Sequence, residues 1–128
     1  MKRGLNTMNE NLGKNVWVIR DGVMSDTSCG NFVSHEAVCV LNLGDTAAEI
    51  SLTIMFEDRE PLGGFKAVCE PRRTNHIRLD KIVNDKGERI PKEVPYAVLV
   101  ESSVPIVAQH SRMDVSQPSM TLMTTIPY

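Results

Sequence analysis

Five polar or charged side chains follow an apolar run in the segment 104–114, which reads V-P-I-V-A-Q-H-S-R-M-D. Because side chains alternate along a strand, His110 and Arg112 share a face with the apolar Ile106, and Gln109 takes the opposite face. A polar side chain on a core face is costly unless it meets a partner or a ligand. This segment is therefore the first candidate for a binding site.

Two other segments offer partners for it, and each contains one of the two remaining histidines. His35 and Glu36 stand at the head of an apolar run, and His76 lies in the basic stretch 72–78. Arginine forks suit carboxylates, phosphates or sugar hydroxyls, and histidine and glutamine add directional hydrogen bonds. The same residues could equally form ion pairs that fix strand register or a subunit interface. The residues alone support both interpretations equally.

Other chemistries find less support. Three histidines and Glu36 could form a metal site, but no H-x-H or H-x-x-x-H spacing is present. His110, Ser111 and Asp114 lack the G-x-S-x-G elbow of a hydrolase, and adjacent strand residues point to opposite faces. The arginines of 72–78, without interleaved aromatic residues on an acidic chain, are a poor nucleic-acid footprint. A metal-dependent sugar-processing enzyme remains a third alternative.

The composition is that of a soluble globular protein. The chain has 128 residues, 41% hydrophobic and 23% charged, with a formal net charge of −2, which predicts one domain with a core of its own. Three cysteines in no metal-type spacing argue against a disulfide framework. No apolar run exceeds five residues, so the sequence contains neither a membrane helix nor a signal-peptide core. We expect a cytoplasmic protein.

Strand patterns cover most of the chain. Residues 1–14 are predicted to be a flexible leader, and 15–128 a single β domain. Short apolar or alternating segments separated by Gly/Pro turns favour an all-β sandwich or barrel. The second and third strands, separated by a Gly-Asp turn, are predicted to form a hairpin. The expected strands are 15–20, 34–43, 48–56, 65–70, 72–79, 96–101, 104–113 and 120–126, with a turn at Ser102-Ser103.

Several short motifs, each present once, are spread over nearly the whole chain. They are Trp17; Ser34-His35-Glu36 with Val38-Cys39, Leu41-Asn42 and Gly44-Asp45; Asp58 with Glu60-Pro61 and Gly63; Arg72-Arg73-Thr74 with His76 and Arg78; and Val104-Pro105-Ile106-Val107 with Gln109-His110, Arg112 and Asp114. In these motifs the chain resembles the sensory rhodopsin transducer family, small soluble proteins whose founding member partners a cyanobacterial sensory rhodopsin. The resemblance implies an antiparallel eight-stranded β-sandwich, jelly-roll-like, that assembles as a homotetramer.

The resemblance also implies a function. It places the chain among non-enzymatic domains that bind a small molecule, a sugar or a related polar metabolite, in signalling. The alternative is a soluble adaptor that docks on the cytoplasmic face of a membrane photoreceptor. We expect no catalytic residue, metal, cofactor or nucleic-acid partner. Carried over by position, the candidate ligand-binding residues are His35, Glu36, Arg73, His76, Gln109, His110, Arg112 and Trp17.

Overall fold

The computed structural model describes residues 12–128. Residues 1–11 of the predicted leader lie outside the described residues, and Lys14, its last residue, already belongs to the first strand. All regular elements within 12–128 are strands, and all their pairings are antiparallel. The all-β, antiparallel part of the prediction is therefore confirmed. No helix in this part of the chain is long and apolar enough to cross a membrane.

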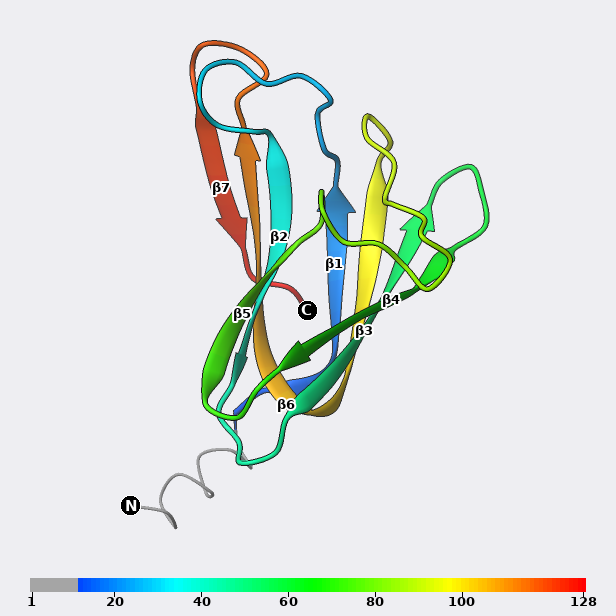
Figure 1. The fold of residues 1–128 in the computed structure, drawn as a ribbon, viewed down its shortest axis with the longest axis vertical. Helices are drawn as coiled ribbons and strands as arrows, with labels where there is room; N and C mark the ends of the chain where they lie inside the picture. Colours follow the sequence, from blue (N-terminus) through cyan, green and yellow to red (C-terminus); the bar gives the residue numbers. More distant parts are fainter. Residues whose placement is uncertain (1–11) are drawn as a thin grey trace.

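Seven strands form one curled sheet (Figure 1). Their sequences are rich in β-branched and apolar residues, and turn-forming residues such as Gly44 and Pro71 separate them. The strands are β1 (Lys14–Gly22), β2 (His35–Asn42), β3 (Ala48–Phe56), β4 (Leu62–Cys69), β5 (Arg73–Arg78), β6 (Tyr96–Asp114) and β7 (Thr121–Thr125).

The long strand β6 holds the two halves of the sheet together. Its first part lies between β1 and β3, where Val100 pairs with both Trp17 and Leu52. Its last part lies between β2 and β7, where His110 pairs with both Val38 and Thr125. β4 extends the first half beyond β3, and β5 extends the second half beyond β2. The chain thus brings two four-stranded groups together through one shared strand.

The predicted count of eight strands is wrong, because the segments 96–101 and 104–113 are one continuous strand. Ser102 and Ser103, predicted to turn, remain extended. Ser102 pairs with Ile50 of β3, and the hydroxyl of Ser103 accepts a 2.9 Å hydrogen bond from the Glu49 amide. Serine favours turns through local side-chain bonds, but here the neighbouring strand occupies these groups.

The predicted hairpin of the second and third strands is also wrong. β2 pairs with β5 and β6, whereas β3 pairs with β4 and β6. Asn42 at the end of β2 is buried, and its side-chain amide donates 2.9 Å hydrogen bonds to the carbonyls of Thr46 and Cys69. These bonds, with a bond from the Gly44 amide to the Asn42 side chain, fix a turn that carries the chain from one half to the other.

One hydrophobic core joins both halves of the sheet. It takes Ile50, Leu52 and Ile54 from β3, which alternate with less buried residues as the sequence predicts, and Val38 and Val40 from β2. The connecting segments close its ends with Met24, Leu79 and Ile90. Against this apolar background, the buried polar residues are conspicuous; they are Ser34, Glu36, Asn42, Asn84 and His110.

Candidate functional site

Glu36 is the centre of a buried polar cluster. Its side chain has no exposed surface, yet each carboxylate oxygen accepts two hydrogen bonds. Oε1 accepts from the Tyr96 hydroxyl at 2.6 Å and from His110 Nε2 at 2.8 Å. Oε2 accepts from Arg112 Nε at 2.7 Å and from the Val23 amide at 2.9 Å. We name Glu36, Tyr96, His110 and Arg112 the Glu36 cluster.

The strand register explains why these residues meet. Glu36 pairs directly with Arg112 across β2 and β6, and His110 lies two residues further along β6, on the same face. Paired residues of antiparallel strands point to the same side of the sheet. Tyr96 begins β6 in the other half of the sheet, and its ring reaches Glu36 from there. The cluster therefore bonds the two halves of the sheet to each other.

The hydrogen bonds decide the charge of the cluster. Burial on its own would raise the pKa of Glu36, but the bonds from His110, Tyr96, Val23 and Arg112 outweigh it and lower the pKa below 4.5. Burial raises the pKa of Tyr96, and the negative Glu36 raises it further. Glu36 is therefore ionised at neutral pH. Tyr96 stays protonated, and its hydroxyl donates a hydrogen bond to the carboxylate.

Two members of the cluster contact residues at the surface. His110 Nδ1 lies 3.2 Å from the Thr125 hydroxyl on β7. Arg112 Nη2 donates to the Asp21 carbonyl at 3.5 Å and lies 3.8 Å from the Asp21 carboxylate. The Arg112 side chain keeps 21% of its surface exposed, whereas Glu36 keeps none. The cluster thus extends from a closed interior toward β1 and β7.

A surface pocket lies at the same place. We name it the β1–β7 pocket; it has a volume of about 190 Å³ and is lined by Val18, Ile19, Arg20, Asp21, Met123, Thr125, Ile126 and Pro127. Asp21 and Thr125, which bond with Arg112 and His110, are among these residues. Arg20 and Asp21 also line a second pocket of about 270 Å³, and Tyr96 is another of its lining residues. A molecule bound at either place would lie next to the Glu36 cluster.

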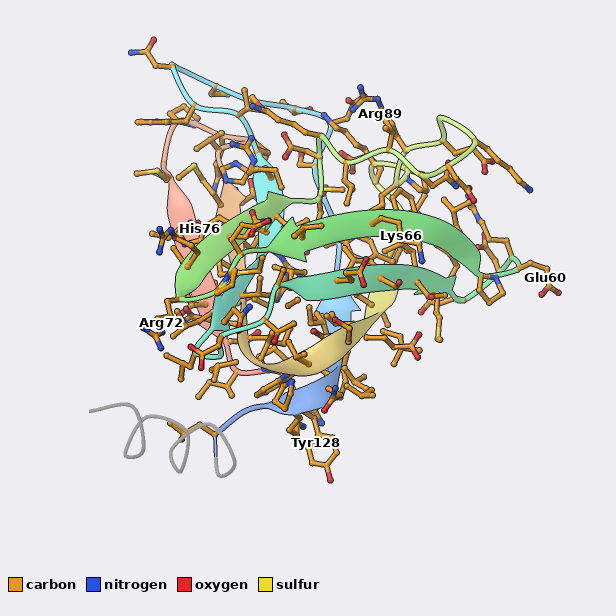
Figure 2. All side chains as sticks on the ribbon, turned by 60° about the horizontal axis from the view of Figure 1, so that its bottom comes forward. Glu60, Lys66, Arg72, His76, Arg89 and Tyr128 are labelled. Atoms are coloured by element: carbon orange, nitrogen blue, oxygen red, sulfur yellow. The ribbon has the colours of Figure 1, made fainter. Side chains whose placement is uncertain are left out.

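Three other predicted ligand-binding residues lie on the opposite face of the sheet. His76 and Gln109 both pair with Cys39, one from each side of β2, so the three side chains share a face. His76 is exposed on the outside of β5 (Figure 2). His35 lies on the same face, and its Nδ1 is 2.7 Å from the Val33 carbonyl. The structure therefore separates these residues from the Glu36 cluster.

The last two predicted residues stand apart from both groups. Arg73 is exposed at the start of β5, where its guanidinium donates to the Arg72 carbonyl at 3.2 Å. Trp17 is buried in the core, and its Nε1 donates to the carbonyls of Ile106 and Lys14 at 3.0 and 3.1 Å. A buried indole whose N–H is hydrogen-bonded to backbone carbonyls in this way has a structural role in the core.

Sequence reasoning did not single out Tyr96, Asp21 or Thr125. In the structure Tyr96 shares the buried face of β6 with Val98 and Val100, a spacing that alternation along the strand would give, and a buried tyrosine needs a hydrogen-bond partner. That need was a usable signal, although it names no partner. Asp21 and Thr125 carry no such signal, because only the fold brings β1 and β7 next to the end of β6.

The triad considered from the sequence does not assemble. His110 points into the cluster, whereas its neighbour Ser111 lies on the other face of the sheet, 4.0 Å from the thiol of Cys39. The carboxylate of Asp114 accepts from the Ser116 amide at 2.8 Å. Within residues 12–128, no group of three or more His, Cys, Asp or Glu side chains is placed to hold a metal ion.

The fold and the cluster together define a small all-β domain with a charged cluster buried beside a surface pocket. The sequence model of the Anabaena sensory rhodopsin transducer family matches residues 12–128, so the chain belongs to that family. This confirms the resemblance found in the sequence motifs.

Solved structures agree with this assignment. The crystal structure of Thermotoga maritima 1070 is 41% identical with a TM-score of 0.82, over 91% of this chain and 94% of that one. The Anabaena sensory rhodopsin transducer is 37% identical with a TM-score of 0.71, over 80% of this chain and 90% of that one. No curated protein matches the chain.

Proposed function

We propose that this chain is a non-enzymatic domain that binds a small polar molecule, a sugar or a related metabolite, in a signalling system. One observation carries the proposal: the Glu36 cluster shares hydrogen bonds with Asp21 and Thr125, which line the β1–β7 pocket. Burying charged groups is costly, and apolar residues of similar volume often stabilise a fold equally well. A charged cluster placed against a pocket is therefore better accounted for by recognition than by stability.

The lining of the pocket favours this class of ligand. The side chain of Arg20 can donate hydrogen bonds, that of Asp21 can accept them, and the Thr125 hydroxyl can do both. The remaining lining residues are apolar. A sugar ring presents hydroxyl groups at its edge and C–H groups on its faces, which matches such a mixed lining. The volume of about 190 Å³ is below the roughly 300–1,000 Å³ typical of pockets for drug-sized ligands, which favours a molecule about the size of one sugar ring.

The cluster is better suited to hold a ligand than to react with one. A general base must reach the proton that it removes, but Glu36 is fully buried and its two oxygens already accept four hydrogen bonds. The raised pKa of Tyr96, caused by burial and by Glu36, keeps its proton in place. Binding without turnover is the role that this arrangement supports.

Native mass spectrometry of the purified full chain is the first test. We expect an assembly that carries extra mass of a small metabolite per chain, and release of that compound would identify it. Calorimetry with the released compound would then give its stoichiometry and affinity. A bare assembly that also takes up none of a panel of monosaccharides and sugar acids at millimolar concentration would contradict the binding proposal.

The proposal includes a homotetramer in the cytoplasm, with no nucleic acid as partner. Its support is membership of the family and the net charge of −2, which disfavours binding to polyanions. The same mass spectrum measures the assembly directly. A single-chain species at micromolar concentration would refute this part of the proposal and leave ligand binding to be judged by its own readout.

The second candidate function is that of an adaptor that docks on the cytoplasmic face of a membrane photoreceptor. It is supported by the 37% identity to a protein whose name describes it as a sensory rhodopsin transducer. Retention of this chain on immobilised cytoplasmic loops of a photoreceptor at low salt would support it. No retention under those conditions would count against it.

A further inference from the structure

His110 connects the buried carboxylate of Glu36 to the lining of the β1–β7 pocket. Its side chain keeps 1% of its surface exposed, and its two ring nitrogens have different partners. Nε2 lies 2.8 Å from Glu36 Oε1, and Nδ1 lies 3.2 Å from the hydroxyl oxygen of Thr125. His110 and Thr125 pair across β6 and β7, so they share a face of the sheet. The imidazole therefore lies directly between a buried charge and a pocket residue.

The bond to Glu36 determines which ring nitrogen carries a proton. Burial raises the pKa of Glu36, but its hydrogen bonds outweigh burial and hold the pKa below 4.5, so Glu36 is ionised at neutral pH. An ionised carboxylate only accepts hydrogen bonds, so the proton between the two side chains belongs to His110 Nε2. In a neutral imidazole one nitrogen donates and the other accepts. Nδ1 of a neutral His110 is then the acceptor.

The charges of the cluster favour a neutral His110. Glu36 carries one negative charge, and Arg112, whose Nε donates to it at 2.7 Å, carries one positive charge. Tyr96 is uncharged, because burial and the negative Glu36 raise its pKa. At the surface, the carboxylate of Asp21 lies 3.8 Å from the other end of Arg112. A protonated His110 would add a second positive charge where Glu36 already has a counter-ion, and an uncompensated charge in the interior is costly.

A neutral His110 fixes the direction of the Thr125 hydroxyl group. The single hydrogen of this hydroxyl is donated to Nδ1, and two lone pairs remain. Thr125 is exposed and lines the pocket, so these lone pairs are what the hydroxyl offers to a bound molecule. Asp21 lines the same pocket with a carboxylate, which only accepts. One acceptor from β1 and one from β7 thus lie beside the Glu36 cluster.

We propose that this end of the β1–β7 pocket is an acceptor site, where Thr125 and Asp21 accept hydrogen bonds from hydroxyl groups of an uncharged sugar. His110 is the positioning residue that sets the direction of the bond at Thr125. The acceptor site rests on the proposed function and narrows its ligand class. A carboxylate or phosphate group placed here would meet only lone pairs, so the site selects neutral sugars over sugar acids. Arg20 supplies a donor for an acceptor elsewhere on the ligand.

The first measurement is the tautomer of His110, by nuclear magnetic resonance of the full chain with isotope-labelled histidine. The chain has three histidines, and His35→Gln and His76→Gln variants assign the signals of the other two. At neutral pH we expect a proton on Nε2 of His110 and none on Nδ1. A proton on Nδ1, in the other tautomer or in an imidazolium, overturns the inference, because the Thr125 hydroxyl would then accept from the ring and donate into the pocket.

The second measurement is calorimetry with glucose, galactose and mannose, and with monodeoxy and monodeoxyfluoro derivatives of each sugar that binds. Fluorine replaces a hydroxyl group at similar size but cannot donate a hydrogen bond. At the hydroxyl group that faces Thr125, we expect both derivatives to lose affinity alike, about tenfold, the usual net effect of one hydrogen bond. Thr125→Val should weaken binding of the parent sugar by a similar factor and abolish this discrimination.

Thr124→Val is the matched control for Thr125→Val. Thr124 is the neighbouring exposed threonine of β7, but it pairs with Ser111 on the outer face of the sheet. Its substitution removes the same hydroxyl group from the same strand, so we expect it to leave both the affinity and the discrimination unchanged. An equal loss of affinity in Thr124→Val and Thr125→Val would overturn the inference, because the effect would then come from β7 as a whole.

The remaining outcomes separate the acceptor site from the proposed function. Equal losses for the deoxy and fluoro derivatives, abolished only by Thr125→Val, support the acceptor site. Fluoro derivatives that bind as well as the parent sugar at every position overturn it, since the pocket would then require no donor from the ligand. Binding of glucuronate or galacturonate but of no neutral sugar overturns the acceptor site and leaves the proposed function standing. Binding of neither class overturns both, whatever the tautomer of His110.

Discussion

Gly22 lies so close to the ring of Tyr96 that a Cβ atom added at Gly22 would overlap the ring atoms. The two residues pair at the end of β1 and the start of β6, and the same ring carries the hydroxyl that donates to Glu36 at 2.6 Å. Gly22 is not among the glycines with a positive φ, so close packing rather than backbone conformation requires glycine here.

Gly22→Ala should therefore displace Tyr96 and weaken its bond to Glu36. Overpacking of this kind typically costs about 1–3 kcal/mol, which urea denaturation would measure. Gly63→Ala is the matched control, because a Cβ atom there meets only the Thr53 hydroxyl, at 4.0 Å. Equal stability of the two variants would show that the ring of Tyr96 moves aside at no cost.

Glu36→Gln should destabilise the protein in a pH-dependent way. The amide would turn an N–H toward donors that now bond to Oε2, from Val23 and Arg112. Breaking a buried ion pair typically costs about 3–5 kcal/mol. Because the pKa of Glu36 is lowered below 4.5 in the folded protein, ionised Glu36 stabilises the fold above that pH, and this contribution is lost as the pH falls through the lowered pKa.

The stability of wild type and variant should therefore converge in acid. Free energies of unfolding from urea titrations between about pH 3 and pH 7 would show the difference shrinking at low pH. Asp58→Asn serves as the control, since Asp58 has a lowered pKa through its bond to Arg59 but lies at the surface. A Glu36→Gln difference that stays constant with pH would mean that the charge of Glu36 contributes nothing.

The alternation of side chains along a strand predicted part of this site. It placed His110 and Arg112 on the core face, and the structure finds them there. It also placed Gln109 and Ser111 on the opposite face, and their pairing with β2 agrees. A period of two follows from strand geometry alone, so no knowledge of the fold was needed.

The rest required long-range pairing, which no local pattern contains. Three histidines in three segments suggested one site, but the register puts His35 and His76 on the outer face and only His110 with Glu36. The Ser102-Ser103 pair has turn chemistry, yet its pairing with β3 keeps it extended. Neither result follows from the sequence, because each depends on which strand lies alongside.

Ligand binding should distinguish the two faces of the sheet. If the ligand occupies the pockets beside the Glu36 cluster, Arg20→Ala removes a donor from both of them and lowers affinity about tenfold or more, since each lost 1.4 kcal/mol is a factor of ten. His76→Ala, on the outer face, should leave affinity unchanged. Calorimetry with the compound recovered from the native protein would measure both.

The opposite pattern would move the ligand to the outer face. Loss of binding in His76→Ala with full binding in Arg20→Ala would assign recognition to the row of His76, Cys39 and Gln109. The side chains of Arg20 and His76 are both exposed, so neither substitution should unfold the protein. Circular dichroism and the mass of the assembly would confirm that each variant keeps its fold.

The contact of the Lys14 ammonium with two aromatic rings should contribute to stability, and one of these rings belongs to Trp17, the only tryptophan of the chain. The ammonium lies 4.4 Å from the ring centre of Trp17 and 4.6 Å from that of Tyr128, and two backbone bonds hold Tyr128 against Val18. Exposed cation–π contacts contribute about 0.5–1 kcal/mol. Lys14→Met keeps an apolar side chain over the rings but removes the charge, so it should lower the free energy of unfolding by about that amount.

The fluorescence of Trp17 gives an independent readout of the same contact. Its indole is only 8% exposed and is held by bonds to the carbonyls of Ile106 and Lys14, so the emission maximum should stay constant in Lys14→Met while the intensity changes. Lys66→Met on β4, where Lys66 bonds to Ser51, should change neither. If both variants match wild type in intensity and stability, the charge of Lys14 does not hold the end of the chain against β1. If only Lys14→Met loses stability, the contact between Lys14 and the two rings helps to close the β1 edge.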